Sequence, residues 1–141
     1  MTSYRKLITT DSRTYIESNN FISAFARISA DLEMLLFEKL FFEKSIKAEL
    51  IEKWSLYTFI QWNIKLDLIE EKWSQILHDF RKLRNKVIHG RVFLINLVKN
   101  QEELEEAKNL LLSVCDFIDQ TAIVYRSTPE LEKAYGAIKR Y

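Results

Sequence analysis

Apolar residues recur at intervals of three and four along most of the chain, which is the period of an α-helix. The longest such stretch runs from Phe21 to about Lys44, and its stripe consists of Phe21, Ala24, Phe25, Ile28, Leu32, Leu35 and Leu36. A second face of the same helix is formed by Ala26, Ala30, Glu33 and Phe37. We therefore expect one long helix that packs on two sides, with a further element or a partner chain on the second.

Shorter helices are predicted before and after this one. Thr10 or Asp11 can cap a helix that ends near Ser18, and Ser55 can cap another that ends before a break at Asp67. The remaining predicted helices span about residues 45–54, 70–88, 100–126 and 128–141.

The segment 70–88 has an apolar stripe and is followed by a residue that can end a helix. Its stripe consists of Trp73, Ile76, Leu77, Phe80, Leu83, Val87 and Ile88. Gly90 follows at a position where glycine commonly adopts the left-handed conformation that ends a helix, which would put His89 at the C-cap. The next segment, RVFLINLV at 91–98, is β-prone, so we expect packed coil or one strand of a minor ribbon there.

Composition favours an all-helical protein. Only 2 Gly and 1 Pro occur in 141 residues, too few for the tight turns of a sandwich, a barrel or an alternating α/β fold. Apolar residues make up 48%, enough for a folded core, and the length suits one domain. We expect a single all-α domain over residues 1–141, an antiparallel bundle of four to six helices.

The helix around Cys115 has more apolar surface than one core face requires. Its main face consists of Leu104, Leu111, Val114, Ile118 and Ala122, while Phe117, Ile123 and Val124 lie off that face. Surplus apolar surface of this kind indicates a dimer.

Charge and cysteine content narrow the possible partners. With 21 basic and 20 acidic residues the net charge is +1, so nucleic-acid binding would require a local patch. One cysteine and two histidines are too few for a structural zinc site, and we expect neither a metal nor a cofactor. The first 15 residues have no apolar signal core and no apolar run is long enough to span a membrane, so a soluble cytoplasmic protein is expected.

Arg84 occupies a position where the helical pattern calls for an apolar residue. At 100° per residue it lies in the sector of Leu77, Phe80 and Val87. A buried guanidinium keeps its proton, so it needs a carboxylate, a phosphate or a wet cleft. Glu33, on the second face of the long helix, is the carboxylate we expect. A purely structural ion pair, or an arginine stem that passes Trp73 toward solvent, would also explain the position.

Polar residues capable of chemistry surround Arg84 at the helix end. Asn85 and His89 are four residues apart and share one side. An imidazole exchanges protons near neutral pH and a guanidinium binds two phosphate oxygens, which are the requirements of phosphodiester cleavage without a metal. The basic residues that could bind the nucleic-acid backbone are Arg81, Lys82, Lys86 and Arg91, with Lys99 further on. His78 is expected to be a solvated helix residue, and Trp54, Trp62 and Trp73 to be core residues.

The sequence LRNKVIHG, Leu83 to Gly90, resembles the signature of the HEPN superfamily, in which Arg-Asn, three residues and His close a long helix of a small bundle. The resemblance implies a helical dimer whose two motifs face each other, often a metal-independent ribonuclease of toxin or defence systems. On this chain Arg84 would stabilise the phosphate, His89 would transfer protons during attack by a ribose 2′-hydroxyl, and Asn85 would orient one of them. The implied products are a 2′,3′-cyclic phosphate and a 5′-hydroxyl.

The resemblance leaves two points open. Toxins of the family that pair with a nucleotidyltransferase antitoxin often have tyrosine two residues after the histidine, whereas this chain has Arg91 there. An antitoxin partner is therefore an open possibility. Some members bind nucleic acid, a nucleotide or a protein without cleaving RNA, so a non-catalytic module is the alternative prediction.

Overall fold

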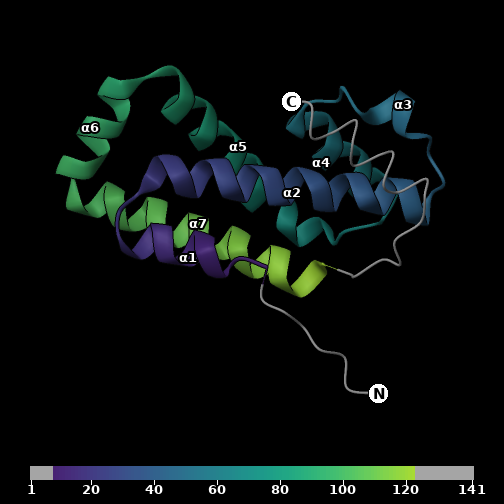
Figure 1. The fold of residues 1–141 in the computed structure, drawn as a ribbon, viewed down its shortest axis with the longest axis horizontal. Helices are drawn as coiled ribbons and strands as arrows, with labels where there is room; N and C mark the ends of the chain where they lie inside the picture. Colours follow the sequence, from purple (N-terminus) through teal and green to yellow (C-terminus); the bar gives the residue numbers. More distant parts are fainter. Residues whose placement is uncertain (1–7, 123–141) are drawn as a thin grey trace, which may run out of the picture.

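The computed structural model describes residues 8–122, and these are helical apart from short connections (Figure 1). The α-helices are α1 (Thr10–Glu17), α2 (Phe21–Glu43), α3 (Ala48–Ile51), α4 (Leu56–Lys65), α5 (Ser74–His89), α6 (Arg91–Lys99) and α7 (Gln101–Thr121). A 3-10 turn, η1 (Glu71–Trp73), precedes α5. The all-α prediction is confirmed for this part of the chain, with seven α-helical segments instead of the four to six expected. The helix predicted at 128–141 lies outside the described residues.

Helix α2 forms the centre of the fold. It packs against α1, α4 and α7, and its predicted stripe is buried throughout, with Ile28, Leu32 and Leu36 fully enclosed. Figure 1 shows that α1 and α2 run in opposite directions, whereas α2 and α7 run in the same direction. The bundle is therefore only partly antiparallel.

Side-chain caps fix several of the helix starts. Ser55 accepts a hydrogen bond from the Thr58 amide, as predicted, and Asn20 and Asn100 do the same for α2 and α7. Helix α1 ends at Glu17, close to the predicted end at Ser18, but the predicted cap is wrong. Thr10 and Asp11 lie inside the helix, and Thr9 at the N-cap position binds Asp119 of α7 through its hydroxyl instead of capping α1.

A buried amide joins α4 to the centre. Asn63 is fully buried, and its Nδ2 donates to the carbonyl oxygens of Leu36 at 3.1 Å and Phe59 at 2.8 Å. This side chain satisfies two backbone acceptors at once and fixes α4 on α2.

The predictions for residues 90–98 were wrong. Gly90 has φ −152° and ψ 104°, an extended conformation open to any residue, so it does not end α5 in the left-handed region. The β-prone segment that follows is helix α6, which buries Leu97 and packs Leu94 against the core. Packing against α5 and α7 has outweighed the local β propensity.

Of the three residues expected to give the Cys115 helix surplus apolar surface, the structure describes Phe117. Phe117 is fully buried, with its ring 5.2 Å from that of Trp73, so it belongs to the core. Ile123 and Val124 lie outside the described residues. The exposed apolar side chains near the end of α5 are Ile88, Val92, Ile95 and Val98. None of the helices within residues 8–122 has the length and hydropathy needed to cross a bilayer.

Candidate functional site

Arg84 is held by the carboxylate that the sequence suggested. Its Nη1 lies 3.1 Å from Oε1 of Glu33, so α5 and α2 are joined by an ion pair. The Arg84 side chain is 17% exposed and that of Glu33 is 42% exposed, which places the pair at the rim of the core and in contact with water. The arginine therefore reaches the surface between two helices.

Asn85 is the second partner of this guanidinium. Nη2 of Arg84 donates to Oδ1 of Asn85 at 3.4 Å, a long hydrogen bond between adjacent residues. A guanidinium has five N–H donors, so the bonds to Glu33 and Asn85 leave further donors on the same group. The Arg84 Nε is buried without a hydrogen-bond partner within residues 8–122. Arg84 is thus oriented by two residues without being saturated by them.

His89 is the last residue of α5 and is exposed. No hydrogen bond or ion pair joins it to another side chain in the described part of the chain. It lies five residues after Arg84, about 7.5 Å further along the helix axis. The imidazole is exposed, and among the described residues no hydrogen bond or ion pair joins it to Arg84 or Asn85.

Arg81 and His78 pack against a tyrosine of α4 that the sequence did not single out. The Arg81 Cζ lies 5.1 Å from the centre of the Tyr57 ring, and the His78 and Tyr57 ring centres are 5.4 Å apart. His78 also lies 3.4 Å from Gln61 through its Nε2. Burial, followed by the nearby charges of Arg81 and Lys82, lowers the pKa of His78 below its ordinary value. No spacing in the sequence indicates this cluster, because the contact joins two helices.

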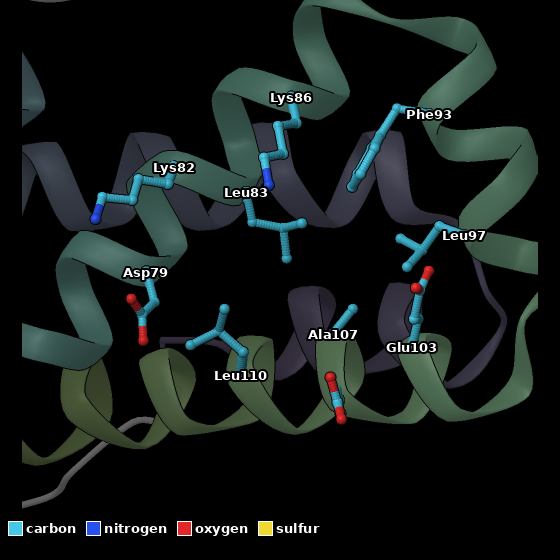
Figure 2. A pocket seen from close by; sticks show the side chains of 10 residues that line it. Asp79, Lys82, Leu83, Lys86, Phe93, Leu97, Glu103, Ala107 and Leu110 are labelled. Atoms are coloured by element: carbon cyan, nitrogen blue, oxygen red, sulfur yellow. The ribbon is translucent and has the colours of Figure 1, made fainter.

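The two lysines of the predicted basic set lie on another side of α5. Lys82 and Lys86 line an open cleft of about 420 Å³ between α5, α6 and α7 (Figure 2). The cleft also has carboxylates and apolar side chains, and its full lining is Asp79, Lys82, Leu83, Lys86, Phe93, Leu97, Glu103, Glu106, Ala107 and Leu110. Lys86 Nζ lies 5.8 Å from the centre of the Phe93 ring. The three carboxylates offset the lysine charge, so this cleft is not a basic groove.

The predicted basic set is therefore distributed around α5. Arg84 meets α2, Arg81 meets α4, and Lys82 and Lys86 face the cleft beside α6 and α7. Arg91 is the first residue of α6. Arg81, Arg84 and Asn85 lie on the side of α5 that faces away from the cleft. We take them as the candidate site in preference to the cleft, where carboxylates offset the lysine charge.

Other reactive groups do not extend this site. Cys115 is buried in α7, and burial raises the pKa of its thiol to about 11, so it remains protonated at neutral pH. Residues 8–122 contain no group of three His, Cys, Asp or Glu side chains placed to hold a metal ion. The chemistry available at the α5 tip is that of a guanidinium, an amide and an imidazole.

No family model matches this sequence, no curated protein matches it, and no solved structure matches the fold.

Proposed function

We propose that this protein is a metal-independent endoribonuclease of the HEPN type, acting in a toxin or defence system. It works as a homodimer in which Arg84, Asn85 and His89 of two copies form one cleft. The observation that carries the proposal is the orientation of Arg84 by Glu33 and Asn85 near the end of α5, with an exposed His89 five residues further on.

The proposed reaction is an internal transfer at phosphorus. The ribose 2′-oxygen attacks the adjacent phosphorus while a neutral His89 accepts the hydroxyl proton. The P–O5′ bond breaks, and the departing 5′-oxygen takes a proton from the protonated imidazole of His89 in the second copy. The products are a 2′,3′-cyclic phosphate and a 5′-hydroxyl. Arg84 stabilises the negative charge that builds up on the phosphoryl oxygens.

A second function is favoured by the same ion pair. If the Glu33 carboxylate is the only anion that Arg84 binds, the chain is a non-catalytic module for a protein, nucleotide or nucleic-acid partner. The two proposals differ in whether Arg84 and His89 are needed for bond cleavage.

The test is RNA cleavage by the purified protein in excess chelator. We expect fragments that end in a 2′,3′-cyclic phosphate, and we expect His89→Ala to lower the rate by about 100-fold or more, the range of general acid–base catalysis. The matched control is Glu49→Ala, which removes an exposed side chain of α3 at the other end of the molecule from the α5 tip (Figure 1). Equal cleavage by the parent and His89→Ala would exclude the catalytic role, and absence of cleavage by the parent would favour the binding module.

A further inference from the structure

Arg81 differs from the other arginines whose side chains the structure describes. Arg13, Arg27 and Arg84 each lie within 4 Å of a carboxylate, whereas Arg81 has no carboxylate partner in the described part of the chain. Its guanidinium lies over the Tyr57 ring instead. A cation that is held by a ring but paired with no anion retains the capacity to bind one.

Arg81 lies beside two rings, those of Tyr57 and His78, and the Tyr57 ring is partly exposed to solvent. Tyr57 is 49% exposed, and the rings of Tyr57 and His78 meet at 45°. Two polar atoms here, Nε of Arg81 and Nδ1 of His78, are buried without a hydrogen-bond partner among residues 8–122. Buried polar atoms normally find partners, so this cluster has unused hydrogen-bonding capacity.

We infer that Tyr57, His78 and Arg81 form a subsite for one nucleotide of single-stranded RNA, beside the cleavage site. This inference rests on the proposed function. The base stacks on the guanidinium or on the open part of the Tyr57 ring, since base faces bind both aromatic rings and arginine planes. Arg81 also bonds to the neighbouring phosphate, and His78, unprotonated at neutral pH, bonds to a base edge.

The register along α5 supports this assignment. Arg81 and Asn85 are four residues apart, so they share one side of the helix with about 6 Å between them along its axis. A strand that places its reactive phosphate at Arg84 and Asn85 therefore reaches Arg81 with an adjacent nucleotide. The subsite selects unpaired RNA, because a base within a duplex cannot expose its face to Tyr57.

The test is binding of a fluorescent ten-nucleotide RNA in which every ribose is 2′-O-methylated and cannot react. We expect Tyr57→Leu to weaken binding roughly 5- to 20-fold, because it removes the stacking surface, and Tyr57→Phe to bind within about twofold of the parent. Arg81→Lys keeps the charge but loses the plane, so a loss of roughly fivefold is expected. The matched control is Lys53→Gln, which removes one exposed charge outside the cluster.

An abasic oligonucleotide of the same length separates stacking from charge. We expect it to bind the parent more weakly than the RNA and to be insensitive to Tyr57→Leu. The inference is overturned if the parent does not bind the methylated RNA, if Tyr57→Leu and Arg81→Lys bind it as the parent does, or if both oligonucleotides bind equally. Arg81→Lys and the abasic probe decide the question if Tyr57→Leu fails to fold.

The outcomes also separate this subsite from the proposed catalysis. Cleavage of natural RNA with unchanged binding by the Tyr57 and Arg81 variants would keep the ribonuclease and reject the subsite. Binding that depends on Tyr57 without any cleavage would keep the subsite and reject the ribonuclease.

Discussion

The Arg84–Glu33 pair joins α5 to α2 and leaves part of the arginine side chain exposed. Arg84 points into an apolar sector, and the cost of desolvating its charge is reduced because Glu33 meets it at the rim of the core. In the proposed ribonuclease, the same pair would orient the guanidinium toward the substrate phosphate. A structural role and a catalytic role are therefore compatible at this position. The effect of the ion pair on the free energy of unfolding measures the structural role.

We predict that Glu33→Gln destabilises the fold by about 1 kcal/mol, because it leaves a largely covered guanidinium without its counter-charge. Urea denaturation gives the difference in the free energy of unfolding. Glu70→Gln is the matched control, since the Glu70–Lys72 pair is 71% and 64% exposed and should change stability by less than about 0.5 kcal/mol. Equal stability of Glu33→Gln and the parent would show that Arg84 does not depend on this carboxylate.

The lowered pKa of His78 should make the free energy of unfolding depend on pH. Burial and the charges of Arg81 and Lys82 lower its pKa in the folded state, so the unfolded chain binds more protons on this residue. Stability must then decrease as the pH falls below the unfolded pKa of about 6.5, until both states are protonated. We expect His78→Gln to show a smaller decrease in the free energy of unfolding between pH 7.5 and 5.5 than the parent. If the free energy of unfolding of His78→Gln decreases with falling pH as steeply as that of the parent, the prediction is contradicted.

At the scale of whole elements, the backbone conformation of Gly90 between α5 and α6 differs from the prediction: it is extended, not left-handed. A left-handed glycine resists substitution, whereas an extended one does not. A Cβ at Gly90 would lie 3.4 Å from the Lys86 carbonyl oxygen and 3.5 Å from the Phe93 Cβ, both ordinary contacts. Gly90→Ala should therefore be neutral or stabilise by up to about 1 kcal/mol, by reducing the entropy of the unfolded chain. A loss of 1 kcal/mol or more on thermal or urea unfolding would support the left-handed conformation instead.

The sequence predicted a helix well where the spacing of apolar residues within that helix defines its buried face. The stripe of α2 repeats from Phe21 to Leu36, so its buried face follows from periodicity alone. The position of Glu33 on the other face led to the Arg84 contact. Helix α6 was missed because it has only nine residues, three of them β-branched, and its apolar residues show no decisive period. Its helical state depends on Leu97 being buried against neighbours that the local sequence does not specify.

The candidate site was predictable only where it follows one helix. Arg84, Asn85 and His89 lie on α5 at fixed offsets, so their proximity could be inferred from numbering. Tyr57 was missed because its contact with Arg81 depends on how α4 crosses α5, which no local spacing encodes. For the same reason the basic residues were expected to form one patch. Those on α5 instead point in three directions, toward α2, toward α4 and into the cleft beside α6 and α7.

At the scale of the whole molecule, the proposed cleft requires a surface on which two copies meet. Helix α6 projects Val92, Ile95 and Val98 outward at every third position, with exposures of 70%, 54% and 48%. Ile88, next to His89 at the end of α5, is also exposed, at 65%. Exposed apolar residues that are grouped on one element commonly mark an interface. A two-fold contact here would bring two His89 side chains toward each other.

We therefore expect the parent to be a dimer, with twice the chain mass of 16.8 kDa by light scattering coupled to size-exclusion chromatography. Ile95→Lys places a charge in the proposed interface and should shift the protein to the single-chain mass. It should also abolish RNA cleavage while leaving the helical circular dichroism unchanged. The matched control is Leu50→Lys, which changes an exposed apolar residue on α3 at the opposite end of the molecule (Figure 1). A monomeric parent that cleaves RNA would show that one copy of the α5 tip is sufficient, and an Ile95→Lys dimer would place the contact on another face.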